Sequence, residues 1–222
     1  MAPEERIPMK SAGCTGVLLK VAYEGTYFHG WAAQAHTRTV EQTLQDALHA
    51  VAPDATALRG TSRTDAGVHA EGQLVTFDTH RLLPARAWVA LLNQHLPEDV
   101  SVRAACAVPA GFTARFKTIS KRYRYRLLLD PIRDPLCRTR AWRIKWALDR
   151  ARLAREATCL EGTHDFAAFR TSSDKRTSTF CTLTRVQIES QSDHRVGIVF
   201  EGDRFLHHMI RILVGTLVEV AL

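Results

Sequence analysis

The sequence predicts an α/β (α+β) protein made of two successive α/β halves. Apolar runs of strand length alternate with stretches of helical periodicity along the chain. Its 222 residues fit one large domain or two small halves, which would join near residues 109–120. We therefore expect a polar lead over residues 1–16, a first half over 17–110 and a second half over 111–222. Hydrophobic residues make up 45% of the chain and charged residues 24%, which excludes disordered, collagen-like and low-complexity proteins.

The first half is predicted to alternate strands and helices. Residues 17–23 are apolar enough for a buried strand, which the turn signal Glu24-Gly25-Thr26 ends. Thr39 is placed to cap a helix, because apolar side chains recur at helical spacing from Val40 to Val51. After the loop 59–72 we expect a strand over 73–78, a helix opened by Pro84 and a strand over 100–108.

The second half opens with a strictly alternating run. Lys121, Tyr123, Tyr125 and Leu127 share one face of a strand, and three arginines share the other. This pattern predicts a strand with an aromatic face. The patterns that follow predict a helix near 148–160, a polar loop over 170–178, strands over 182–189 and 195–201, and an apolar helix over 205–222.

Positive charge is concentrated in one segment. The chain carries a formal net charge of +7, and residues 111–150 alone hold twelve Lys or Arg against three Asp. Aromatic residues are interleaved there, which suits RNA, because cations bind phosphates and aromatic rings stack on exposed bases. A solvated basic face with its aromatic residues in the core explains the composition equally well. An anionic partner is indicated, with nucleic acid first and acidic lipid second.

No segment predicts membrane insertion, export or a disulfide framework. The only long apolar stretch, 205–222, contains His207, His208, Arg211 and Glu219, so it is interpreted as a buried helix with core or surface histidines. The first 15 residues lack an apolar signal core, which makes the cytoplasm the default compartment. The five cysteines are widely spaced without a C-x-x-C pair, so we expect buried thiols and no zinc site.

One loop carries a candidate catalytic carboxylate. Asp65 precedes Ala66-Gly67, and alone it would be read as a turn residue. Arg63 lies two residues before it, and a guanidinium in the same pocket would keep the carboxylate ionised, as a nucleophile or base requires. Phosphate-binding glycine loops and the H-E-x-x-H zinc motif do not occur, and the S-x-x-K match at residues 172–175 lacks its companion motifs.

The run from Ser62 to Gln73, Ser-Arg-Thr-Asp-Ala-Gly-Val-His-Ala-Glu-Gly-Gln, followed by Phe77, resembles the signature of the tRNA pseudouridine synthase A family. The likeness spans residues 17–220 in one order. It continues through Tyr23-Glu24-Gly25, Gly30-Trp31, Gln34, Phe112-Thr113-Ala114-Arg115-Phe116, Lys121-Arg122-Tyr123-Arg124-Tyr125, Asp165-Phe166, Phe169-Arg170, Arg176-Thr177, Phe205-Leu206-His207-His208-Met209-Ile210-Arg211 and Val214-Gly215.

The resemblance implies a tRNA pseudouridine synthase that isomerises uridines 38–40 of the anticodon stem-loop. It also implies a pseudo-two-fold relation between the halves, antiparallel or mixed sheets, a central basic cleft and a homodimer. The reaction is redox-neutral, so no cofactor and no metal are expected. The implied catalytic residues are Asp65, Arg63, Tyr123 and Arg211. The implied tRNA-binding residues are Tyr123, Phe112, Arg115, Phe116, Arg170 and Arg176.

The sequence departs from the family pattern at three places. Ser62 replaces a common Gly, so the backbone there must be one that a residue with a Cβ can adopt. Ala32 replaces a common Gln, at the cost of one polar contact to RNA. Family members continue past the last helix to a final strand, whereas this chain ends at Leu222, so we expect an incomplete element with uncovered apolar faces.

Two other classes of function stay open at this stage. An RNA-binding module without catalysis would keep the basic segment and lose turnover. A carboxylate-dependent hydrolase would also use an Asp-Arg pair, but it would need a second acid/base carboxylate or a metal cluster, and the sequence shows neither.

Overall fold

The computed structural model describes residues 13–174 and 176–222, so most of the polar lead and Lys175 lie outside the described residues. The chain divides into two compact units, Met1–Thr118 and Ile119–Leu222. Each unit contains its own β-sheet and its own hydrophobic core. The predicted mixed α/β class with antiparallel and mixed sheets is confirmed.

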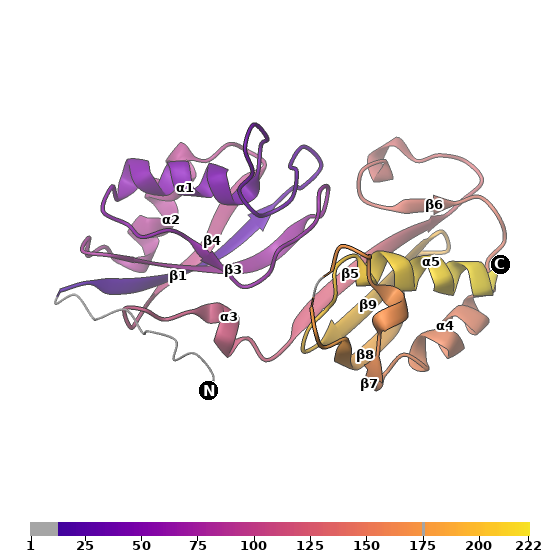
Figure 1. Ribbon diagram of the computed structural model, residues 1–222. Coiled ribbons are helices and arrows are strands. Elements are labelled where there is room, and N and C mark those ends of the chain that lie inside the picture. Colours follow the sequence, from indigo (N-terminus) through magenta and orange to yellow (C-terminus); the bar gives the residue numbers. More distant parts are fainter. Residues whose placement is uncertain (1–12, 175) are drawn as a thin grey trace, which may run out of the picture. The chain divides into compact units, whose positions relative to one another are not determined.

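The first unit is a four-stranded antiparallel sheet with two helices on one face (Figure 1). The strand order is β2-β3-β1-β4, formed by Arg59–Gly60, Ala70–Thr79, Thr15–Tyr23 and Val100–Val108. Helices α1 (Val40–Val51) and α2 (Ala85–His95) bury apolar side chains against this sheet, among them Leu44, Leu48 and Trp88. The strands and helices predicted for this half are confirmed.

Two short elements of the first unit were not predicted from the sequence. Strand β2 has two residues, and helix α3 (Ala114–Lys117) is a single turn, so neither gives a periodic signal. Helix α3 contacts β2 and β3, and the Arg59 guanidinium donates to the Phe112 carbonyl at 3.3 Å. Residues 111–118 therefore pack in the first unit, ahead of the unit boundary at Thr118.

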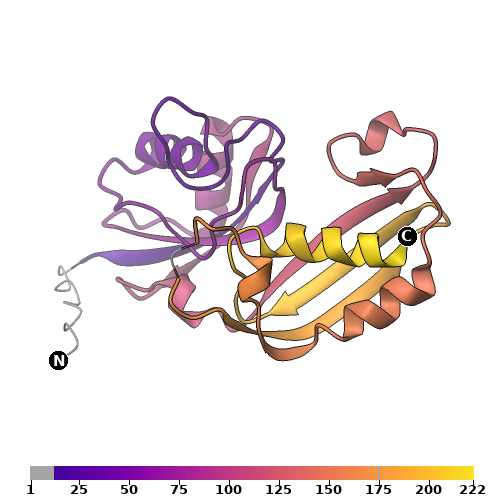
Figure 2. The ribbon, with the colours of Figure 1, turned by 45° about the vertical axis from the view of Figure 1, so that its right-hand side comes forward.

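The second unit is a five-stranded mixed sheet covered by two helices. The strand order is β6-β5-β9-β8-β7, formed by Trp142–Ile144, Lys121–Leu129, Arg195–Gly202, Phe180–Ser190 and Gly162–Asp165. Only the β5–β6 pairing is parallel. Helix α5 (Met209–Ala221) lies across the sheet beside α4 (Arg150–Thr158), as Figure 2 shows. Two 3₁₀ turns, η1 (Pro135–Cys137) and η2 (Ala167–Phe169), complete the unit.

The alternating pattern of β5 is confirmed by its pairing with β9. Tyr123, Tyr125 and Leu127 lie opposite Phe200, Ile198 and Val196, which are all buried, so the aromatic face of β5 is the core face. Strands β6 and β7 were not predicted, because β6 has three residues and every residue of β7 is exposed.

Helix α5 corrects three expectations. It begins at Met209, so His207 and His208 precede the helix, and His208 has a left-handed backbone with φ of 61°. Its apolar side chains do not lack cover: they are buried against the sheet and α4 at Met209, Leu213, Val214, Leu217, Val218 and Ala221. No helix of the described residues is long and apolar enough to cross a membrane.

The expectation of buried thiols is wrong for four of the five cysteines. Cys181 is buried, whereas Cys14 and Cys137 are half-buried and Cys106 and Cys159 are exposed.

Candidate active site

Asp65 lies on the loop between β2 and β3 in the first unit, at the start of a tight turn. The amide of Val68 donates to the carbonyl of Asp65 at 3.2 Å, and Gly67 has φ of +77°. The turn therefore needs a residue without a Cβ at its third position. The Asp65 side chain is half-buried, so solvent or a ligand can reach it. The turn-residue interpretation thus describes the backbone of Asp65, and the half-buried side chain is accessible from solvent.

A neighbouring segment, residues 23–31, holds the backbone on both sides of Asp65. The Tyr23 hydroxyl is 2.8 Å from the Thr64 hydroxyl, and the Trp31 amide donates to the Thr64 carbonyl at 3.0 Å. On the other side, the amide of Gly67 donates to the Phe28 carbonyl at 3.3 Å. Since Tyr23, Phe28 and Trp31 are core residues, the loop is anchored to the rigid part of the unit.

Gln73 anchors the beginning of the same loop from β3. Its buried side chain donates to the carbonyl of Ser62 and accepts a hydrogen bond from the Thr61 hydroxyl at 3.1 Å. Ser62 is not among the residues with positive φ, so the Ser at this position carries no backbone strain. The departure from the family's Gly is therefore compatible with the loop, as expected.

Gly30 is a position in this anchor where a side chain would disturb the loop directly beside Asp65. It has φ of +91°, and a Cβ there would lie 2.7 Å from the Thr64 carbonyl oxygen. We expect Gly30→Ala to lower the free energy of unfolding by about 1–3 kcal/mol. Urea unfolding followed by circular dichroism measures this change.

Gly215→Ala is the matched control for Gly30→Ala. Gly215 lies within α5, and a Cβ there would meet nothing within 4 Å. The control should stabilise the protein by about 0.5–1 kcal/mol, because Ala is the better helix former. Equal free energies for Gly30→Ala and the parent would contradict the steric argument.

Arg63, Phe112, Arg115 and Phe116 also belong to the first unit. Arg63 is exposed, and among the described residues its side chain makes no hydrogen bond or ion pair. Arg115 and Phe116 lie on α3, where the Phe116 ring is 75% exposed. An aromatic ring so far from the core is free to stack on a base. Phe112 is half-buried just before α3.

Tyr123 and Arg211 belong to the second unit. The Tyr123 ring, on β5, meets the Phe205 ring edge to face with centroids 5.0 Å apart. Tyr123 is half-buried, so one side of its ring is packed and its orientation is restricted. Arg211 is exposed on the first turn of α5.

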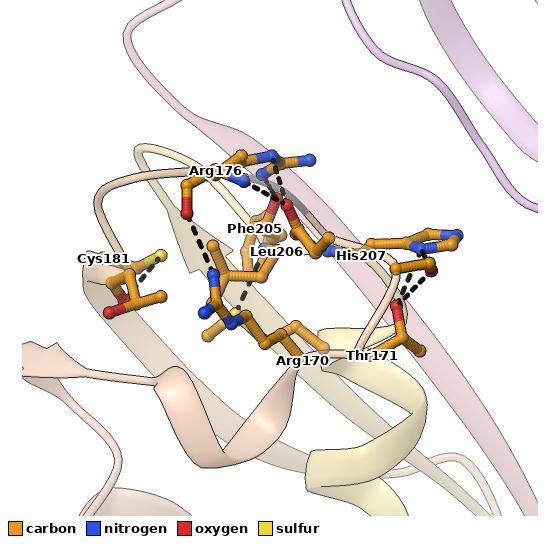
Figure 3. A network of polar contacts seen from close by, with 11 residues as sticks. Arg170, Thr171, Arg176, Cys181, Phe205, Leu206 and His207 are labelled. Atoms are coloured by element: carbon orange, nitrogen blue, oxygen red, sulfur yellow. Dashed lines mark hydrogen bonds and ion pairs between the residues drawn. The ribbon is translucent and has the colours of Figure 1, made fainter.

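A polar network ties residues 170–174 and Arg176 to the segment before α5 (Figure 3). Asp174, whose side chain is 4% exposed, accepts from the amide of His207 at 2.8 Å and from that of Arg176 at 3.1 Å. The Nδ1 atom of His207 lies 2.8 Å from the Thr171 hydroxyl. Burial alone would raise the pKa of Asp174, but the two amides and the nearby Arg176 and Arg170 outweigh it and lower this pKa below its usual value.

Arg170 and Arg176, predicted to bind phosphates, also have partners within the unit. Arg176 donates from Nη1 to the Phe205 carbonyl at 2.6 Å, and its Nε is 3.5 Å from Asp174. Arg170 donates to the Arg176 carbonyl at 2.9 Å. Both guanidinium groups thus help to shape this loop.

The comparisons with known proteins agree with one another. A family described as tRNA pseudouridine synthase matches residues 20–117 and 157–222. The tRNA pseudouridine synthase A of Geobacter sp. strain M21 is 41% identical over 92% of this chain and 82% of its own length. The enzyme of that name from Acetivibrio thermocellus is 38% identical over 93% and 84%. The chain belongs to the tRNA pseudouridine synthase family. A further relative of the same name, from Aromatoleum aromaticum, is 42% identical over 92% of this chain and 77% of its own length.

The family match covers most of the candidate site. Asp65 and Arg63 lie in the first matched range, and Arg170, Arg176 and Arg211 lie in the second. Tyr123 falls in the unmatched residues 118–156.

Sequence reasoning missed Asp174 and the partners of His207. The available signal was a lone acid in a polar loop between two arginines, which the sequence alone does not distinguish from an exposed ion pair.

Proposed function

We propose that this chain converts uridine to pseudouridine in tRNA, at positions 38–40 of the anticodon stem-loop, with Asp65 as the catalytic carboxylate. The observation that carries the proposal is the signature loop itself. In a chain of this family, the backbone around Asp65 is fixed from three directions by Tyr23, Trp31 and Gln73. A carboxylate that must attack one sugar carbon, or remove one proton, needs such fixed support.

The reaction breaks the N1–C1′ glycosidic bond, turns the uracil and forms a C5–C1′ bond. The C5 proton leaves to water and N1 regains a proton, so the step is redox-neutral and needs no cofactor or metal. Asp65 attacks C1′ or removes the C2′ proton, and the target uridine must leave its stack to reach it.

Arg63, Arg211 and Tyr123 are assigned supporting roles in this proposal. The two arginines would stabilise negative charge on the reacting groups, and the Tyr123 ring would pack against the uracil. The exposure of Arg63 and Arg211 and the packing of Tyr123 on Phe205 support these roles.

Phe112, Arg115, Phe116, Arg170 and Arg176 are assigned to tRNA binding. The exposed ring of Phe116 and the exposed cation of Arg115 suit a stacked base and a phosphate. The resemblance to the family also leads us to propose a homodimer, in the cytoplasm where tRNA is modified. Sedimentation equilibrium measures the oligomeric state.

Arg115→Gln should weaken tRNA binding and flatten its salt dependence. Each lost phosphate contact lowers the slope of log affinity against log salt by about 0.7–0.9. Arg86→Gln is the matched control, because Arg86 is an exposed cation on α2 of the same unit. Filter binding between ~50 and ~200 mM salt measures both slopes. Identical slopes for the two variants would exclude Arg115 as a phosphate ligand.

The test of the proposed function is the mapping of pseudouridine in an unmodified tRNA transcript incubated with the full chain. Carbodiimide modification and primer extension locate the product. We expect protein-dependent stops one nucleotide to the 3′ side of positions 38–40, which place pseudouridine at those positions. Product at other positions would refute the assigned specificity, and no product with tightly bound tRNA would favour an RNA-binding protein without catalysis.

A further inference from the structure

The second unit contains a cavity of about 500 Å³ at the edge of its sheet, beside β6 and the loop that joins β5 to β6. This loop projects past the sheet edge in Figures 1 and 2. Four cations line the cavity, Arg133, Arg138, Arg143 and Lys145, together with one carboxylate, Asp134. The cavity is therefore strongly basic.

The single carboxylate of the lining does not neutralise these cations, because it is already bound elsewhere. Asp134 forms an ion pair at 2.8 Å with Arg195 of β9, which is not part of the lining. It also accepts from the Leu136 amide at 2.9 Å and from the Cys137 thiol at 3.2 Å.

Most of the lining cations lack a partner. Arg143 donates to the Pro131 carbonyl at 3.0 Å. Arg133, Arg138 and Lys145 are exposed, and their side chains form no hydrogen bond or ion pair with any other residue that the structure describes. Like charges gathered around one cavity repel each other, and a bound anion removes that repulsion.

An aromatic ring lies in the same lining. Trp142 of β6 is 41% exposed, and it meets Tyr125 edge to face with centroids 6.5 Å apart. A cation binds a phosphate group, and an indole ring stacks on a base, so the combination fits a nucleotide better than an inorganic anion.

Hydrogen bonds and an ion pair within the second unit hold the loop around the cavity. Asp134 caps the 3₁₀ turn η1, and the amides of Arg140 and Ala141 both donate to the Cys137 carbonyl at 3.0 Å. The Arg195 ion pair fixes the turn to the sheet. A cavity of fixed shape loses little conformational entropy on binding.

We propose that this cavity binds a nucleotide of the tRNA other than the uridine that is isomerised. Arg138 and Lys145 contact its phosphate, and Trp142 stacks on its base. The inference rests on the proposed function, with tRNA as the substrate. It adds a second site on the protein that contacts the tRNA. The cavity-lining residues lie within residues 118–156, between the two ranges that match the family model.

The test compares two double variants of the full chain. Arg138→Gln/Lys145→Gln removes two cavity cations, and Arg152→Gln/Arg155→Gln removes two exposed cations of α4 that do not line the cavity. We expect the cavity variant to raise the Kd for unmodified tRNA about tenfold at ~0.1 M salt and to lower the salt slope by about 0.7–0.9, because both cations contact the same phosphate. The kcat at saturating tRNA should stay unchanged. Trp142→Leu should raise the Kd without changing the slope, because it removes stacking and no charge.

Three results would overturn the proposal. The first is equal tRNA affinity and salt slope for the two double variants. The second is tight binding of AMP that the cavity variant loses while its tRNA affinity is unchanged, since the ligand would then be a free nucleotide. The third is a change in sedimentation mass with unchanged tRNA affinity, which would make the cavity a protein interface. Cavity-dependent binding without pseudouridine formation by the parent would refute the proposed function and leave this inference intact.

Discussion

Asp65→Asn is expected to lower pseudouridine formation by at least about 10³-fold while changing the Kd for tRNA less than about threefold. The amide is nearly isosteric with the carboxylate but is neither a nucleophile nor a base at neutral pH. The loop should keep its shape, because hydrogen bonds to the backbone of Thr64, Asp65 and Gly67 and to the Thr64 hydroxyl anchor this segment, and the substitution leaves them in place. Release of tritium from tRNA labelled at uridine C5 measures the reaction, since each turnover loses the C5 hydrogen to water.

Asp46→Asn is the control for the change of charge. Asp46 is exposed on α1 of the same unit, where it accepts from the Gln42 side chain at 2.8 Å. This variant should turn over like the parent. If Asp65→Asn retained activity within tenfold of the parent, with the same melting temperature, another residue would have to supply the catalytic group.

Elements with a hydrophobic period could be predicted from the sequence, and those without one could not. Strand β4 agrees with the predicted range 100–108 at both ends, because turn signals bound its apolar run. Strand β2 is defined by the pairing of Arg59 and Gly60 with Thr76 and Val75 of β3. Its own two residues therefore carry no pattern that predicts a strand. Strand β7 is exposed along its whole length and pairs only with β8.

In the candidate site, too, the sequence predicts local features and does not predict long-range contacts. A local run of residues points to Asp65, so a motif is enough to find it. Its supports come from far along the chain: Tyr23 reaches Thr64 across 41 positions, and no pattern within either segment predicts that contact. The same holds for Asp174 and His207, which are 33 positions apart. Contacts of this kind depend on the fold, which brings the two segments together.

Asp174→Asn should destabilise the second unit, because the two carboxylate oxygens of Asp174 accept from two different backbone amides. His207 donates to Oδ2 and Arg176 donates to Oδ1. An asparagine offers one acceptor oxygen and one NH₂ group, so one amide loses its partner and faces another donor. Leaving one buried donor unpaired costs about 1–3 kcal/mol in the free energy of unfolding.

The stability difference between the parent and Asp174→Asn should depend on pH, and the pKa of Asp174 gives the sign of this dependence. The pKa of Asp174 is lowered in the folded protein, so the carboxylate stabilises the fold above the pKa that it has in the unfolded chain. This stability is lost as the pH falls through the lowered folded pKa. The difference in the free energy of unfolding between the parent and Asp174→Asn should therefore be largest near neutral pH and should shrink below pH ~4. Urea unfolding at a series of pH values, followed by tryptophan fluorescence, measures this difference.

Asp193→Asn separates the effect of the network from that of net charge. Asp193 lies in the exposed turn between β8 and β9 of the same unit, where its carbonyl, not its carboxylate, accepts from Arg150. This control should unfold at the same urea concentration as the parent. A gap between parent and Asp174→Asn that stayed constant from pH 7 to pH 3 would show that the Asp174 carboxylate does not stabilise the fold through its charge.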